Sequence, residues 1–150
     1  MKNLILTLAA STCIVLPALG EEKKLELAGS DQMQFSTKTL EVTAGDTVVL
    51  TFKHSGKLPK AAMGHNFVLL KADTKIPDFA MKAMKAVATD YVPDDEESKK
   101  AIVAHTKLLG GGETETLTFT APAEPGAYPF ICTFPGHFAL MQGVLTVKAK

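Results

Sequence analysis

The sequence has no excess of charge of either sign, and no segment of it is repetitive. Its 150 residues contain 16 lysines and arginines against 16 aspartates and glutamates, and no basic stripe is visible along the chain. This balance excludes a nucleic-acid-binding surface built from clustered positive charge. Repeats of a fixed period and low-complexity linkers are also absent, which favours a single domain.

Long apolar runs are missing as well, with one short exception at the start of the chain. Residues 1–20 begin with Lys2, continue with an uncharged apolar stretch and end in small residues before the charged EEKK. This order predicts a secretory signal peptide that is cleaved after Gly20. The run is short and is interrupted by Ser11, Thr12 and Pro17, which does not favour a membrane span. No stable membrane insertion is expected after cleavage. The alternatives are an uncleaved anchor, a shifted cleavage site and, less well matched, lipoprotein processing at Cys13.

Cysteine is scarce, and cleavage would leave only one. Loss of Lys2 would change the balance to 15 basic against 16 acidic residues, a net charge of −1 with neutral histidines. A domain of residues 21–150 is large enough for an ordinary hydrophobic core. Because Cys132 would then have no partner for an internal disulfide, its thiol needs another explanation.

Most of the chain after residue 23 has the pattern of short β-strands. Apolar and polar residues alternate, or run apolar over short lengths, in KLELAG, MQFST, TLEVTAGDTVVLTFKH, HNFVLL, AIVAHTKLL, ETETLTFTAP, AYPFICTF and MQGVLTVKAK. Gly45-Asp46 is typical of a turn between two of these strands. Seven or eight such strands predict an all-β, Greek-key β-sandwich.

One segment departs from the strand pattern. Between residues 76 and 90, Phe79, Met81, Met84 and Val87 recur at spacings of three to four among lysines and alanines, which predicts a helical insertion. Pro77 stands near its start, where the missing amide hydrogen costs little. The following PDDEESKK is expected to be an exposed loop.

The residues that could carry chemistry gather in CTFPGHFALM, residues 132–141. Within it Cys132, His137 and Met141 are separated by a Pro-Gly bend that could bring the three side chains to one point. Each alone has an ordinary explanation, since buried cysteines and methionines are common core residues. Together, a thiolate, an imidazole and a thioether favour a soft metal site.

Two histidines and a cysteine with a long axial methionine suit a blue-copper electron-transfer centre. The second histidine must come from elsewhere in the chain. His65 in MGHNFVLL is favoured because it precedes a strongly apolar strand, whereas spacing alone leaves His54 and His105 open. An enzyme is not expected, because a Cys132–His137 nucleophile pair would lack a third orienting group.

The motifs LPKAAMGHNFVL, IVAHTKLLGGGE, FICTFPGHFALMQGVLTV and DQMQF are similar to those of the azurins, periplasmic blue-copper proteins of the cupredoxin family. The resemblance extends over essentially all of residues 21–150. It implies an eight-stranded, cupredoxin-like Greek-key sandwich with one copper ion at one end. It also implies periplasmic localisation.

The resemblance also implies a role for each site residue. His65, Cys132 and His137 would be the equatorial copper ligands, Met141 the weak axial ligand, and the backbone carbonyl of Gly64 a second distant axial contact. Asn66 would link the two ligand segments and hydrogen-bond near the thiolate. His54 and His105 match family histidines that are not ligands.

The implied function is one-electron transfer by Cu(I)/Cu(II) cycling in a soluble protein. Partners would be redox proteins such as c-type cytochromes or periplasmic reductases, which would dock briefly on an apolar patch. The expected patch residues are Met33, Leu58, Ala62, Met63, Phe134, Pro135, Ala139 and Leu140. The alternative is a copper-binding module for storage or delivery, with the same ligands but readily exchangeable metal.

Two features depart from the family pattern. The positions that match the usual N-terminal disulfide are Lys23 and Asp46, a loss of about 2–4 kcal/mol of stability if nothing compensates. The usual core tryptophan is also missing, and Phe67 occupies its place after His65-Asn66.

Overall fold

A computed structural model describes residues 20–150 of the chain. The predicted signal peptide, residues 1–20, lies outside the described residues except for Gly20. Within the described part of the chain, no helix is both long enough and apolar enough to cross a membrane.

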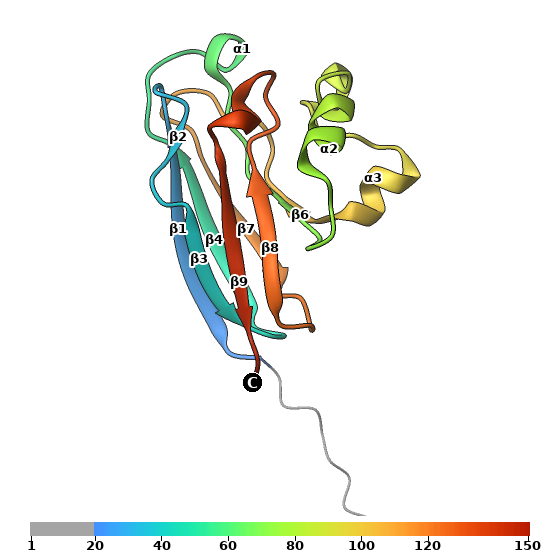
Figure 1. The fold of residues 1–150 in the computed structure, drawn as a ribbon. Helices are drawn as coiled ribbons and strands as arrows, with labels where there is room; N and C mark the ends of the chain where they lie inside the picture. The colour runs from blue at the N-terminus through green and yellow to red at the C-terminus, as the bar shows by residue number, and fades with distance from the viewer. Residues whose placement is uncertain (1–19) are drawn as a thin grey trace, which may run out of the picture.

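Two β-sheets lie face to face and form the body of the molecule (Figure 1). One sheet contains β1 (Glu22–Ser30), β2 (Gln34–Phe35), β4 (Thr47–His54) and β7 (Thr114–Thr120). The other contains β3 (Thr39–Thr43), β5 (Val68–Leu70), β6 (Ile102–His105), β8 (Gly126–Ile131) and β9 (Gln142–Lys148). The strand orders are β2-β1-β4-β7 and β3-β9-β8-β5-β6.

The alternation of side chains explains why these segments form a sandwich. Along β4, Val48, Leu50 and Phe52 are buried, while the residues between them are more exposed. Leu145 and Val147 of β9 are buried in the same alternating way on the opposite sheet. Because successive strand residues point to opposite faces, each sheet contributes one apolar face to a shared core.

The predicted all-β sandwich is confirmed, with nine strands in the described residues instead of the eight expected. Two of the nine, β2 and β5, have only two and three residues. The turn predicted at Gly45 is also present, with φ of 76°, and the Asp46 carboxylate accepts a hydrogen bond from the Thr43 N–H at 2.9 Å. This turn joins β3 and β4, which belong to different sheets.

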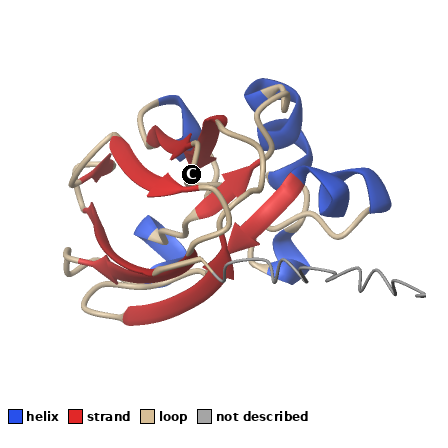
Figure 2. Ribbon diagram, turned by 90° about the horizontal axis from the view of Figure 1, so that it is seen from below, coloured by secondary structure: helices blue, strands red, loops and turns tan. Residues whose placement is uncertain are grey.

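The helical insertion predicted around residues 76–90 is present as α2 (Ile76–Ala83) and the 3-10 turn η1 (Val87–Thr89). The exposed loop predicted for PDDEESKK is wrong from Glu96 onward, where α3 (Glu96–Ala101) forms. Asp95 caps this helix, since its carboxylate accepts hydrogen bonds from the N–H and the hydroxyl of Ser98 at 3.1 and 2.6 Å. Figure 2 shows the two sheets as layers, with most helical residues gathered at one side.

Two apolar clusters hold these layers together. The larger lies between the sheets and includes Phe52, Phe67 and Phe130, with the Phe67 and Phe130 rings 5.3 Å apart. The smaller lies under the helical excursion, which we define as residues 76–101, and is made by Val68, Leu70, Phe79, Ala83, Val92 and Ile131. The excursion is therefore packed against β5 and the end of β8.

Candidate metal centre

Three donor atoms meet in the interior at one end of the sandwich. The Cys132 Sγ lies 3.9 Å from the Nδ1 of His65 and 3.7 Å from the Nδ1 of His137. All three donors lie within 4.8 Å of one another, and all three side chains are buried. The structure thus brings together His65 and Cys132, which are separated by 67 positions in the sequence.

The backbone around each donor explains its position. His65 exchanges two hydrogen bonds with Leu109, at 3.0 and 2.7 Å, just before β5 begins. Cys132 follows the last residue of β8, and its N–H donates to the Met141 carbonyl at 3.0 Å. This bond closes residues 132–141, which we call the ligand loop. Gly136, with φ of 82°, permits the sharp turn that leads into His137.

The spacing of the donors fits a metal ion. Two imidazole nitrogens and a thiolate at ordinary metal–ligand distances of about 2.0–2.3 Å, in a trigonal plane, are about 3.5–3.7 Å apart. The observed contacts to Cys132 Sγ are close to this range. A set of two nitrogens and one thiolate is a soft to borderline donor set that suits copper.

The two expected axial residues lie in the neighbourhood of the donor atoms. A Cβ added to Gly29 would lie 2.9 Å from His65 Cδ2 and 3.2 Å from Met141 Cε, so the His65 ring and the end of the Met141 side chain both lie against Gly29. The Gly64 carbonyl oxygen is 3.9 Å from Cys132 Sγ. Glycine at position 29 is therefore required for β1 to approach the centre closely. The sequence carried no signal for this role.

Hydrogen bonds orient the donors. His65 Nε2–H donates to the Ser30 carbonyl at 2.8 Å, which leaves the Nδ1 lone pair directed at the centre. Asn66 joins the two ligand segments: its Nδ2 donates to Thr133 Oγ1 at 2.7 Å, and its Oδ1 accepts from the Thr133 N–H at 2.8 Å. Neither the Ser30 carbonyl nor Thr133 was predicted from the sequence.

Burial sets the protonation of the centre. It raises the pKa of the Cys132 thiol to about 12, against the opposing effect of the Asn66 and Phe134 backbone N–H groups. It also lowers the pKa of His137 to about 4 and the pKa of His65 below its ordinary value. Without a metal, the centre is consequently uncharged near neutral pH, with a protonated thiol and two neutral imidazoles.

The other two histidines lie outside the donor set. The His54 ring stacks on His65 with centroids 4.3 Å apart. Both its nitrogens are engaged, Nε2 with the Met63 carbonyl at 2.7 Å and Nδ1 with the Gly56 N–H at 3.1 Å. His105 is exposed on β6 and hydrogen-bonds the Thr106 carbonyl at 3.0 Å.

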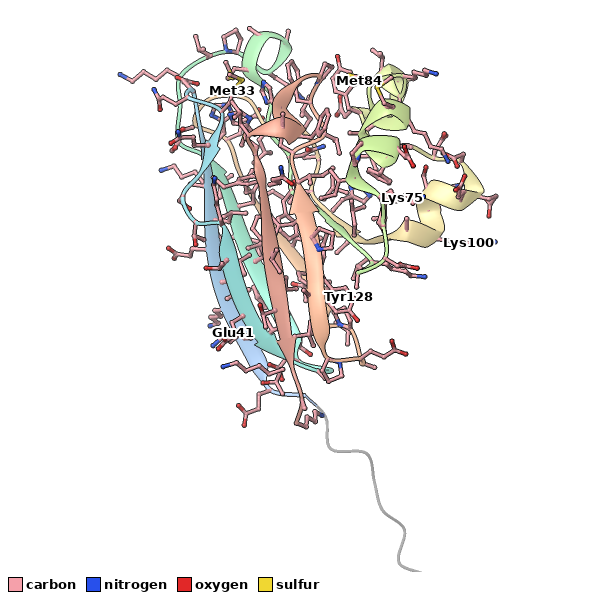
Figure 3. All side chains as sticks on the ribbon, viewed as in Figure 1. Met33, Glu41, Lys75, Met84, Lys100 and Tyr128 are labelled. Atoms are coloured by element: carbon pink, nitrogen blue, oxygen red, sulfur yellow. The ribbon has the colours of Figure 1, made fainter. Side chains whose placement is uncertain are left out.

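The residues expected to form an apolar patch differ in exposure. Leu58 and Leu140 are 41% and 54% exposed, and Ala62 and Ala139 are also exposed. Half-buried members are Met33, Met63, Phe134 and Pro135. Figure 3 shows Met33 at the end of the molecule that carries α1 (Lys60–Met63).

Comparisons with known proteins agree with this geometry. The family model described as copper binding proteins, plastocyanin/azurin family, matches residues 22–148. The azurin of Bordetella pertussis is 40% identical over 153 residues, covering 96% of both chains. Auracyanin A, a "blue" copper protein from Chloroflexus aurantiacus, superimposes with a TM-score of 0.75 at 36% identity, covering 85% of this chain and 99% of that one.

A further relative is longer than this chain. Outer membrane protein H.8 of Neisseria gonorrhoeae is 48% identical over 121 residues, which cover 79% of this chain. The matched region spans 63% of that relative, less than two thirds of its length.

Proposed function

Since the chain belongs to the plastocyanin/azurin family of copper-binding proteins, we propose that it is a blue (type 1) copper protein that carries single electrons between redox partners. The observation that carries the proposal is the buried trio of Cys132 Sγ and the two Nδ1 atoms at 3.9 and 3.7 Å. His65, Cys132 and His137 would be the equatorial ligands, and Met141 and the Gly64 carbonyl the axial groups. One copper ion, when bound, would supply the Cu(I)/Cu(II) couple.

The protein's own contribution is to hold these donors in one arrangement. The bond from His65 to Ser30 and the pair of bonds between Asn66 and Thr133 fix both ligand segments. A buried, preformed donor set changes little between two oxidation states, which keeps the reorganisation associated with electron transfer small.

Electrons would pass through the nearly buried edge of His137, which is 4% exposed. The exposed Leu140 and Ala139 follow it in the ligand loop, and Leu58 and Ala62 contribute from the neighbourhood of α1. A small apolar surface of this kind suits brief docking of redox proteins, such as c-type cytochromes or periplasmic reductases. We place the mature protein, a single domain of residues 21–150, in the periplasm after cleavage of residues 1–20.

The structure also bears on the competing interpretations. A catalytic cysteine needs an accessible thiolate, whereas Cys132 is fully buried and its pKa is raised to about 12. This argues against thiol catalysis. A storage or delivery module would share the ligands but would release copper readily.

The test is a visible spectrum and a voltammogram of the purified, copper-loaded protein. We expect an intense blue colour, a reversible one-electron wave, and loss of both in Cys132→Ser. A colourless wild-type protein with stoichiometric copper would contradict the proposal. Copper loss to a chelator within seconds, without a reversible wave, would favour storage or delivery.

A further inference from the structure

A chain of ring contacts connects His137 to the helical excursion. The Phe134 ring lies 4.7 Å from the His137 ring, with an interplanar angle of 43°. Phe134 also makes an edge contact with Tyr91, with ring centroids 5.3 Å apart and an interplanar angle of 72°. Tyr91 comes from the excursion, so a residue outside the ligand loop is connected to His137 through the Phe134 ring.

A second contact attaches the ligand loop to the excursion on the C-terminal side of His137. Phe138, directly after His137, packs against the apolar cluster beneath the excursion, which contains Phe79, Ala83 and Ile131. Figure 1 shows α2 beside the end of β8 from which the ligand loop departs. The loop is thus attached to the excursion on both sides of His137, through Phe134 and through Phe138.

The backbone at Tyr91 is held in an uncommon conformation. Asp90 and Tyr91 have φ of 53° and 63°, two successive non-glycine residues in the left-handed region. Such conformations persist where surrounding contacts impose them. Here the Tyr91 N–H donates to the Ala86 carbonyl at 2.8 Å, and the ring meets Phe134.

From these contacts we propose that Tyr91 and Phe138 are positioning residues of the metal centre. Through them the helical excursion holds the His137 ring in its ligand position. The inference rests on the proposed function, since it assigns these residues to the same copper site. Tyr91 acts through Phe134, and Phe138 acts through the backbone it shares with His137.

Two consequences follow for a metal bound by His137. Phe134 and Phe138 flank His137 in the ligand loop and both contact the excursion, so the His137 ring stays near its ligand position and metal dissociates slowly. His137 is 4% exposed with Phe134 against its ring, so loosening this part of the loop should admit water to the centre. The apolar shell around a metal site controls its reduction potential. Admitting water stabilises the more highly charged oxidised ion, so removing either ring should lower the potential.

The experiment measures copper transfer to excess EDTA and the reduction potential in four variants. Tyr91→Ala and Phe138→Ala should each speed copper transfer by about fivefold, which corresponds to one lost aromatic contact. Each should also lower the potential. Tyr91→Phe keeps the ring and should stay within about twofold of the wild-type rate. Val87→Ala is the matched control, because Val87 lies on the same excursion and is 64% exposed.

The outcomes separate this inference from the proposed function. Wild-type rates and potentials in both alanine variants would overturn the positioning role, even with a blue, redox-active wild type. A colourless wild type would instead contradict the proposed function. If Phe138→Ala does not fold, Phe138→Leu preserves most of the packing volume, and an unchanged rate and potential in it and in Tyr91→Ala overturn the proposal.

Discussion

At the scale of single residues, the metal-free centre is uncharged, whereas its cysteine thiol must lose a proton and become a thiolate to bind a metal. His65 and His137 are neutral at neutral pH because burial lowers their pKa values. Cys132 keeps its proton because burial raises its pKa to about 12. Metal binding is therefore coupled to the release of the thiol proton alone.

We expect about one proton to be released for each Cu(II) bound between about pH 7 and 8. Affinity should rise with pH in this window, because a thiol with a pKa of about 12 stays protonated until the metal displaces the proton. Below a pH of about 4, His137 also becomes protonated, and the affinity should fall more steeply. Proton release can be followed with an indicator dye in weak buffer. Release of two protons at neutral pH would contradict the assignment of neutral imidazoles.

A second prediction concerns Asn66, whose side chain supplies both hydrogen bonds to Thr133. Asn66→Ala leaves the buried Thr133 N–H without this partner, so it should lower the free energy of unfolding by about 1–3 kcal/mol. It should also weaken copper binding, because the two ligand segments lose their link. Urea denaturation of the metal-free protein measures the first effect. Thr133→Ser keeps both bonds and should behave like the wild type. Equal loss in both variants would refute the role.

At the scale of elements, the backbone of β1 lies so close to the centre that only glycine, which has no Cβ, fits at position 29. A Cβ at Gly29 would lie 2.9 Å from the His65 ring, and the hydrogen bond to Ser30 prevents that ring from moving freely. The strand that carries Gly29 also carries Ser30, so one element both crowds and orients the ligand.

Gly29→Ala should therefore destabilise the protein by about 1–3 kcal/mol, the usual cost of an overpacked site. It should also shift the visible band of the copper form, because His65 or Met141 must move. Thermal unfolding and absorption spectra measure the two effects. Gly126→Ala in β8 is the matched control, since its added Cβ would meet only Tyr128 at 3.6 Å. Equal behaviour of the two variants would refute the close approach.

The elements were predicted well where a local pattern encodes them. Alternation along residues 39–54 revealed two strands and the turn at Gly45, and spacings of three to four revealed α2. α3 was missed because its charged residues have no apolar period, and its start depends on the Asp95–Ser98 cap. The partition of β3 and β4 between two sheets was not predicted, because strand pairing depends on contacts distant in sequence.

The site residues also fall into two groups, those that a local sequence pattern reveals and those that only the fold brings together. Cys132, His137 and Met141 are close in sequence, and a local motif suffices to group them. The apolar strand after His65 favoured it as the remaining ligand, but spacing alone left His54 and His105 open until the family resemblance was considered. Only the folded chain brings the His65 Nδ1 near the thiol. Gly29 and Tyr91 contact residues that are far away in the sequence, and no local sequence pattern predicts these contacts.

At the scale of the whole molecule, the centre joins parts of the chain that have little else in common. β1 supplies Gly29 and the Ser30 carbonyl, the segment before β5 supplies His65, and the ligand loop supplies the other donors. The helical excursion contributes Tyr91, whose ring contacts Phe134 of the ligand loop. A metal ion that bonds to both ligand segments therefore favours the folded state over the unfolded one, in which these groups are far apart.

Copper should accordingly raise the thermal stability of the entire domain rather than of one loop. A ligand that binds only the native state at a thousandfold excess over its Kd adds about 4 kcal/mol. We expect a single transition in calorimetry that moves to higher temperature with Cu(II). Cys132→Ser should gain much less, because it lacks the thiolate and keeps only the neutral donors. An equal copper-induced shift in the variant would show that stabilising copper binds elsewhere. A separate low-temperature transition that does not respond to copper would show that the described residues do not unfold as one unit.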